Sequence, residues 1–345
     1  MISEQLERGL LVKFLSCLAA ALIAAGSAHA APLAPKVIVI TMFKSEAANW
    51  LQDEKLDQKL SVPGLSKAFP ELACDERGLC LMTTSMGYAN AASSISALVL
   101  SDALDLSKTY FLIAGIAGVD PGQGTLGSAH WARYAIDGGL QWEIDGRSLP
   151  EGWPTGYFGI FTKKPGEKPK PDYGNEVIQL NAALAEKAYA LSKDVELLDS
   201  DAAKAYRAHY PAPPANAPPA VSLCDTVSDD TWWHGKAISE AMAAWTKTLT
   251  DGAATYCTTQ QEDNATLTAL QRGADMGRLD FNRVALLRAA SNFDQEYPGE
   301  TPTDSLAANS GGFVPSLVNA YRVGSKLTEA ILSNWDQWKD GPPKG

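Results

Sequence analysis

The chain has 345 residues, of which 46% are hydrophobic and 20% are charged, so it can bury a substantial core in one large or two modest domains. Its formal net charge of −11 argues against nucleic acid, and against an anionic membrane, as the main partner. After residue 30, no stretch approaches the roughly 18 consecutive apolar residues that a membrane-spanning helix needs.

Residues 1–30 have the pattern of a secretory signal peptide. Basic residues precede an apolar run over 15–25, and residues 28–30 (AHA) form a small-x-small cleavage site. We therefore expect a protein that is exported, to a periplasm, and whose mature domain covers residues 31–345.

The mature chain keeps four cysteines, Cys74, Cys80, Cys224 and Cys257. An even number in an oxidising compartment predicts two disulfides, for which three connectivities exist. We favour Cys74–Cys80, which would close a short charged loop, and Cys224–Cys257, which would join two segments near the later motifs. The chain has no Cys-x-x-Cys motif and no clustered histidine pair, so we expect no metal site and no cofactor.

The first predicted core strand is the β-branched run 36–42, which leads through a turn into a helix over 43–51. Glu46 follows the carboxyl end of this strand, where a catalytic acid can lie; the alternative is an acidic residue that favours the first turn of a helix. A second strand is predicted over 80–84, and a helix rich in small residues over 86–100.

Residues 110–113 (YFLI) form a short apolar strand that runs directly into 114–118 (AGIAG). We predict a tight turn there, because small residues let the backbone turn and approach a ligand closely. Gly115, Ala117 and Gly118 are therefore candidate binding residues, since open α/β sheets hold ligands at the carboxyl ends of their strands. A plain strand-to-helix turn is the alternative.

The middle of the chain predicts a hairpin that joins residues 130–136 to 140–144. An exposed loop or flap rich in lysine, proline and glycine follows over 163–175, and an amphipathic helix over 176–192.

The remaining part predicts strands at 221–223, 255–259 and 283–290, and helices at 236–249 and 315–335. Strands that alternate with helices predict an α/β fold in a single domain, with a mixed, largely parallel central sheet flanked by helices.

Several predicted strands deliver polar or aromatic residues at their carboxyl ends. Besides the glycine segment, these are Glu46, Trp232, Trp233, Glu262, Asn292 and Asp294. An aromatic face can stack on a planar base, a carboxylate can accept bonds from two ribose hydroxyls, and an amide can meet a purine edge. Each residue also has a structural alternative, as a core anchor or a helix cap, but the combination suits a nucleoside.

Five motifs lie in order over nearly the whole mature chain: 36–46 (KVIVITMFKSE), 114–121 (AGIAGVDP), 228–235 (SDDTWWHG), 262–266 (EDNAT) and 288–294 (RAASNFD). With these motifs the chain resembles the purine nucleoside permease family, which is related to purine nucleoside phosphorylases and methylthioadenosine nucleosidases. The resemblance implies a nucleoside-phosphorylase-like fold.

The resemblance also implies residue roles. It places Trp232 where an aromatic residue stacks on the base, Glu262 where a glutamate binds the ribose hydroxyls, and Asn292 where relatives carry an aspartate or asparagine that faces the purine. Glu46 falls near an acidic residue of the nucleosidases.

Two departures from the relatives concern the chemistry. In the phosphorylases an arginine and a serine hold phosphate, whereas the matching positions here are Ile113 and Ile116, which offer neither charge nor hydrogen bond. We therefore expect no phosphorolysis. Asn292 cannot donate a proton as a carboxylic acid can, which weakens a general-acid role at the base.

Two functions remain open. The first is an exported purine nucleoside-binding protein that takes part in uptake and passes its ligand to a membrane transport partner, because a chain without a spanning segment forms no channel by itself. The second is an enzyme that cleaves the N-glycosidic bond, by hydrolysis rather than phosphorolysis, with Glu46 or Asp294 positioning water or handling a proton. A homo-oligomer is left open, and a purely structural role is the least favoured alternative.

Overall fold

The structure is a computed structural model that describes residues 31–170 and 173–343. The expected signal peptide, residues 1–30, lies outside the described residues. From Leu33 onward the chain forms one unit.

Within the described residues, twelve strands form one mixed sheet and two more form a separate hairpin. The sheet contains β1 (Val37–Thr41), β2 (Gln58–Ser61), β3 (Glu71–Cys74), β4 (Leu79–Thr83), β5 (Tyr110–Val119), β6 (Ala129–Ala132), β7 (Tyr134–Asp137), β10 (Val177–Gln179), β11 (Val221–Leu223), β12 (Asp225–Ser228), β13 (Tyr256–Gln260) and β14 (Val284–Phe293). The hairpin contains β8 (Trp142–Glu143) and β9 (Tyr157–Phe158).

The α-helices alternate with these strands along much of the chain. They are α2 (Lys44–Asp53), α3 (Tyr88–Leu100), α4 (Ala182–Ser192), α5 (Asp201–Arg207), α6 (Lys236–Leu249), α7 (Asp263–Asp275), α8 (Pro302–Ala307), α9 (Phe313–Ser333) and α10 (Trp335–Trp338). Two short 3-10 helices are also present, η1 (Gly146–Ser148) and η2 (Phe281–Arg283).

The sheet has the order β10-β7-β12-β13-β5-β1-β4-β3-β2, and β14 pairs with both β5 and β6. Its centre is parallel, because β1 pairs in parallel with β4 and β5, and β5 with β14. Antiparallel pairs such as β13 with β5 make the whole sheet mixed. This confirms the predicted mixed α/β sheet.

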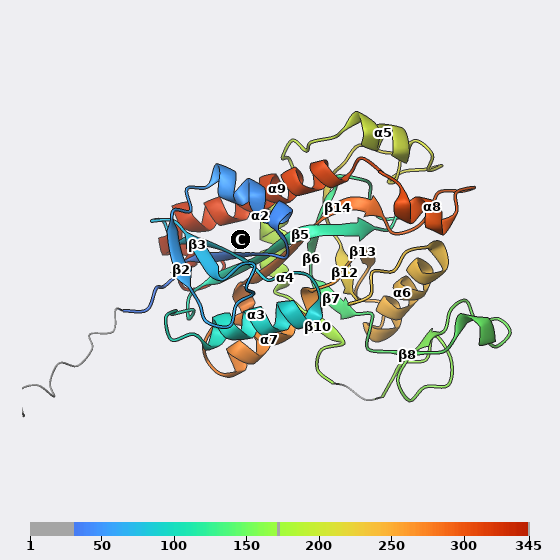
Figure 1. The fold of residues 1–345 in the computed structure, drawn as a ribbon, viewed down its shortest axis with the longest axis horizontal. Helices are drawn as coiled ribbons and strands as arrows, with labels where there is room; N and C mark the ends of the chain where they lie inside the picture. The colour runs from blue at the N-terminus through green and yellow to red at the C-terminus, as the bar shows by residue number, and fades with distance from the viewer. Residues whose placement is uncertain (1–30, 171–172, 344–345) are drawn as a thin grey trace, which may run out of the picture. The chain divides into compact units, whose positions relative to one another are not determined.

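Helices cover both faces of the sheet, which is why β1 is buried along its whole length. Ile38 and Ile40 belong to a core that also contains residues of α3 and α7. Val37 and Val39 face the opposite way, into a core shared with α2, α4 and α9. Figure 1 shows α2 and α9 on one side of the sheet, and α3 and α7 on the other.

Three local predictions were wrong, each because a distant strand determines the pairing. Residues 114–118 do not turn: β5 continues through them to Val119, since β14 pairs with it along its length. The hairpin after β7 is absent from the described residues, because β7 pairs with β10 and β12 instead. The predicted helix over 176–192 begins only at Ala182, after the short strand β10.

One of the two expected disulfides is present. Cys74 and Cys80 lie directly opposite each other in the antiparallel pair β3–β4, with an S–S distance of 2.04 Å. The second prediction was wrong, because Cys224 and Cys257 are buried free thiols.

The strand register shows where the two thiols lie. Asp225 is opposite Tyr256 and Thr226 is opposite Thr258 in the parallel pair β12–β13, so Cys257 is the extra residue of a bulge and Cys224 directly precedes the pair. The two thiols interact without a covalent bond. The Cys257 Sγ also lies 3.5 Å from His130 Nδ1.

Among residues 31–170 and 173–343, no helix has the length and apolar character that are needed to cross a bilayer.

Candidate functional site

A cavity of about 530 Å³ opens where the strands of the sheet end at different heights. Strand β1 pairs with β5 only as far as Ile40 opposite Ile113, whereas β5 and β14 continue together to Val119 and Phe293. The overhanging parts of β5 and β14 form the floor. Segments after β1 and β13, and the chain from α8 to the start of α9, form the walls.

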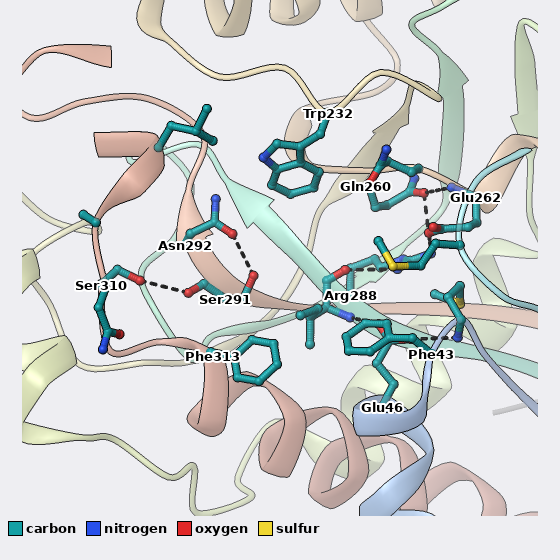
Figure 2. A pocket seen from close by; sticks show the side chains of 17 residues that line it. Phe43, Glu46, Trp232, Gln260, Glu262, Arg288, Ser291, Asn292, Ser310 and Phe313 are labelled. Atoms are coloured by element: carbon teal, nitrogen blue, oxygen red, sulfur yellow. Dashed lines mark hydrogen bonds and ion pairs between the residues drawn. The ribbon is translucent and has the colours of Figure 1, made fainter. Parts of the chain in front are cut away.

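The lining combines polar and apolar side chains. The polar and aromatic members that carry the argument are Glu46, Trp232, Gln260, Glu262, Arg288, Ser291 and Asn292. Apolar members around them include Met42, Phe43, Met86, Ile116, Leu306 and Phe313. The structure therefore brings together four of the predicted site residues, namely Glu46, Trp232, Glu262 and Asn292 (Figure 2).

The glycine segment contributes by leaving space rather than by lining the cavity. Only Ile116 of residues 114–118 is a lining residue, so Gly115, Ala117 and Gly118 do not occupy the predicted position. A Cβ atom on Gly115 would meet Met42 Cε first, and it would lie 2.5 Å from Arg288 Nη1 and 2.6 Å from Glu46 Oε1. Glycine leaves room there for the ends of these three side chains against the β5 backbone.

Glu46 lies in the first turn of α2 and is only 5% exposed. Its Oε2 accepts a hydrogen bond from Met42 N at 2.7 Å, and its Oε1 accepts one from Ile116 N at 2.8 Å. Burial raises the pKa of Glu46 to about 7, against the opposing effects of Arg288 and the two backbone N–H donors. The cavity thus has a carboxyl group that can both hold and release a proton near neutral pH.

Arg288, like Gln260 and Ser291, lines the cavity but was not predicted from the sequence. Its side chain is 1% exposed, although it lines the cavity. Nε donates to Asp263 Oδ2 at 3.1 Å, Nη2 donates to Asp263 Oδ1 at 2.5 Å, and Nη1 donates to the Ile116 carbonyl at 3.0 Å. A charged residue inside an otherwise apolar predicted strand was the signal that could have identified it.

Glu262 lies at the N-cap position of α7, yet it does not cap the helix. Gln260 Oε1 performs that role, because it accepts from the backbone N–H groups of Glu262 and Asp263 at 2.8 and 2.9 Å. The Glu262 carboxylate instead accepts from Gly87 N at 3.1 Å and lies 3.6 Å from Arg288 Nη2. It is 4% exposed, and burial raises its pKa.

The amide of Asn292 is held in one orientation. Ser291 Oγ donates to Asn292 Oδ1 at 2.7 Å, and Asn292 Nδ2 donates to the Phe293 carbonyl at 2.8 Å. These two bonds leave one amide hydrogen and one oxygen lone pair of Asn292 for another partner. Figure 2 shows the half-buried Trp232 near Asn292, with Glu262 on a different side of the cavity.

The structure places Asp294 and Trp233 away from the cavity, contrary to prediction. Asp294 is fully buried, and its Oδ2 accepts from Ser239 Oγ at 2.8 Å and from the Tyr256 hydroxyl. Trp233 packs in an apolar cluster that includes Trp245. The prediction for Asp294 depended on its place at the carboxyl end of a strand, and this place alone does not decide which side chains reach the cavity.

The site can recognise a neutral polar ligand better than an anion. Arg288 is the only cation among its lining residues, and its guanidinium is already bonded to Asp263. Glu46 and Glu262 add carboxyl groups to the same walls. A phosphate in this cavity would therefore have few free hydrogen-bond donors and would lie close to two carboxyl groups.

Comparisons with known proteins identify the family. The model of the purine nucleoside permease family matches residues 34–343. A probable purine nucleoside permease of Schizosaccharomyces pombe is 38% identical over 317 residues, which cover 88% of this chain and 91% of that protein. A purine nucleoside permease of Candida albicans is 35% identical over 314 residues, which cover 89% of this chain and 77% of that protein.

Solved structures with a similar fold include a futalosine hydrolase and nucleosidases. Futalosine hydrolase of Helicobacter pylori aligns with a TM-score of 0.54 at 12% identity, over 86% of this chain and 98% of that one. The 5′-methylthioadenosine/S-adenosylhomocysteine nucleosidase of Neisseria meningitidis aligns with a TM-score of 0.51 at 15% identity, over 86% and 99%. At these identities the likeness shows the fold alone. The extent of the family match and the two permease relatives show that this chain belongs to the purine nucleoside permease family.

Proposed function

We propose that the chain binds a purine nucleoside in this cavity. The observation that carries the proposal is that Trp232, Glu262 and Asn292, from three separate segments, line one cavity. The indole face of Trp232 can stack on the base, the Asn292 amide can bond the base edge, and the Glu262 carboxylate can accept two ribose hydroxyls. The family name and the methylthio-immucillin-A bound to the Neisseria nucleosidase support the same ligand class.

The proposed physiological role is nucleoside capture during uptake. The signal-like pattern of residues 1–30 supports export to a periplasm, and the names of the relatives support a part in transport. An exported protein of this kind would pass its ligand to a membrane transport partner.

Hydrolysis of the N-glycosidic bond is the second candidate, and one observation favours it. The Glu46 carboxyl lines the cavity with a pKa of about 7, so it could take a proton from an attacking water. In that reaction the water oxygen bonds to the sugar C1′, the C1′–N bond breaks, and the departing base needs a proton. Asn292 cannot supply that proton and Asp294 does not line the cavity, which is why we rank capture first.

One experiment separates these candidates. The purified protein is titrated calorimetrically with inosine, adenosine and guanosine, and the same mixtures are analysed by chromatography with and without phosphate. Saturable binding with intact nucleoside supports capture, and free base without phosphate supports hydrolysis. If no nucleoside binds, the proposal is wrong; free base that forms only with phosphate would overturn the interpretation of Ile113 and Ile116.

A further inference from the structure

The chain leaves the main sheet after β7 and returns to it at β10, and these two strands pair directly with each other. Paired antiparallel strands can be joined by a short turn, so the sheet does not require the long segment between them. Its residues 140–170, here called the aromatic lobe, carry the separate hairpin β8–β9. In Figure 1 the lobe is the green segment that carries β8, apart from the main sheet. We propose that the aromatic lobe binds the surface of an anionic lipid bilayer.

The first observation is that the lobe holds five aromatic residues and buries none of them. These are Trp142, Trp153, Tyr157, Phe158 and Phe161. Trp142 contacts Phe158 and Phe161 edge-on, with ring centroids 5.6 and 5.4 Å apart, and Trp153 contacts Phe158 at 5.2 Å. They form an aromatic cluster whose outer edge faces solvent.

Phe161 has two unfavourable features at once. It is 71% exposed, while Trp142 beside it is 41% exposed. Its φ is +61°, a left-handed conformation that costs energy for a bulky residue. Neither feature helps to bury a core. Both are consistent with a side chain held outward for another surface.

The second observation is the charge beside Phe161. Lys163, Lys164, Lys168 and Lys170 are all exposed, and the sequence 163–170 contains only one acidic residue, Glu167. Lys168 is paired with Asp251 at 2.7 Å, while no ion pair is found for the other three lysines in the described part of the chain. The chain as a whole has a net charge of −11, so this is a local reversal of sign.

The overall negative charge does not prevent such a contact. At physiological ionic strength, charges farther away than roughly 8 Å are largely screened. The charges of the lobe itself therefore dominate such a contact. They are Glu143, Asp145, Glu151 and Glu167 against Arg147 and the four lysines, and the lysines are gathered beside Phe161. The acidic balance of the chain still opposes binding by most of its other surface, which favours one orientation.

A bilayer fits the combination better than an acidic protein. Aromatic rings prefer the membrane interface, where their apolar part enters the acyl boundary, and adjacent lysines attract anionic headgroups. The lysines alone would fit any acidic partner. The exposed side chains of Phe161 and Trp142 would also need an apolar environment in the partner. A bilayer provides one without a groove of matching shape.

The test uses the full protein and vesicles of phosphatidylcholine, with and without phosphatidylglycerol, in a flotation assay. We expect binding to the anionic vesicles and its loss in high salt. Each lysine near the surface contributes about fivefold to partitioning, so Lys163→Glu/Lys164→Glu should weaken binding by more than about tenfold. Phe161→Ser should weaken it at every salt concentration, and Phe161→Trp should restore it, with indole fluorescence quenched by brominated lipid.

Matched controls use exposed residues outside the lobe. Met276→Ser removes another exposed apolar side chain, and Lys67→Glu/Lys193→Glu makes the same change in net charge. Both should bind vesicles like the parent protein, and all variants should keep the parent's thermal stability. The proposal is overturned if the protein does not float with anionic vesicles, or if control and lobe variants behave alike. Equal binding of the parent and Phe161→Ser, together with tight binding to soluble polyglutamate, would assign the lobe to an acidic protein instead.

Discussion

Glu46 and Asp294 both lie just past the ends of sheet strands, β1 and β14, and burial raises the pKa of each to about 7. On the cavity side, Glu46 is held by backbone N–H groups and lies close to Arg288. Behind the cavity, Asp294 is held by Ser239 and Tyr256 and does not reach the lining. A raised pKa therefore reports burial in both regions, and only contact with the cavity distinguishes a candidate functional group from a structural one.

The largest effect on stability should follow from breaking the ion pair between Arg288 and Asp263, on the cavity side. Arg288→Met leaves Asp263, which has no exposed surface, buried without its partner. We expect the free energy of unfolding to fall by about 3–5 kcal/mol, as it does when one member of a buried pair is removed. Urea denaturation measures this change. The double variant Arg288→Met/Asp263→Leu should recover much of the loss; a single variant as stable as the parent would show that the pair has no structural role.

The next effect is a dependence of stability on pH, which both regions should share. The folded-state pKa of each carboxyl is about 7, above the reference values of 4.5 for Glu46 and 3.8 for Asp294. The folded state therefore keeps a proton that the unfolded state has lost, so the stability that these two groups contribute is greatest below the reference values and is lost as pH rises toward 7. Each carboxyl should contribute on the order of 3 kcal/mol to this fall.

Unfolding at pH 5 and pH 8 measures the effect, with Glu46→Gln and Asp294→Asn each expected to flatten the curve. Nucleoside binding then separates the two regions. Glu46→Gln should alter the pH dependence of affinity, whereas Asp294→Asn should leave it unchanged. If Asp294→Asn alone altered affinity, the region behind the cavity would take part in ligand binding after all.

The adjacent residues Trp232 and Trp233 allow a second comparison between the cavity lining and the region behind it. Trp232→Ala should weaken purine nucleoside binding by about 1–3 kcal/mol, the range for loss of a base–aromatic stack. Trp233→Phe disturbs only the apolar cluster behind the cavity, so it should lower the melting temperature and leave affinity unchanged. Calorimetric titration with inosine and adenosine checks both. Equal affinity losses in the two variants would indicate a general loosening of this segment.

The smallest expected effect is a change in how strongly the site distinguishes ribose from 2′-deoxyribose. Glu262→Gln keeps the shape of the side chain but removes a charged acceptor, so inosine should lose about 1 kcal/mol more binding free energy than 2′-deoxyinosine. Competition binding of the two ligands gives this difference directly. An equal loss for both would mean that the carboxylate mainly holds Gly87 N and the nearby Arg288 in place.

The sequence predicted most of the elements whose signal is local. The β-branched run 36–42 contains β1, and the predicted helix over 236–249 coincides with α6. Motifs at strand ends also identified Glu46, Trp232, Glu262 and Asn292 as lining residues. These succeed because periodicity and strand position depend on neighbouring residues alone.

The remaining features depend on contacts between distant residues. The continuation of β5 through Gly115 depends on pairing with β14, and the partner of Arg288 becomes visible only when α7 is placed beside that strand. Trp232 and Trp233 are neighbours in the chain, so their type could not decide which one faces the cavity. Pairing and side-chain direction are properties of the assembled sheet.

The register shift in β14 has a consequence for how the site can diverge among relatives. Ala290 is opposite Ala117 and Asn292 is opposite Gly118, so Ser291 is an additional residue without an opposite partner. The bulge thereby determines which side chain at the end of β14 faces the cavity. We expect that a shift of one residue in this register would bring a neighbour of Asn292, Ser291 or Phe293, to its position and so remove the amide from the lining. The group that this strand end offers to the cavity therefore depends on strand length as well as on the residue at position 292.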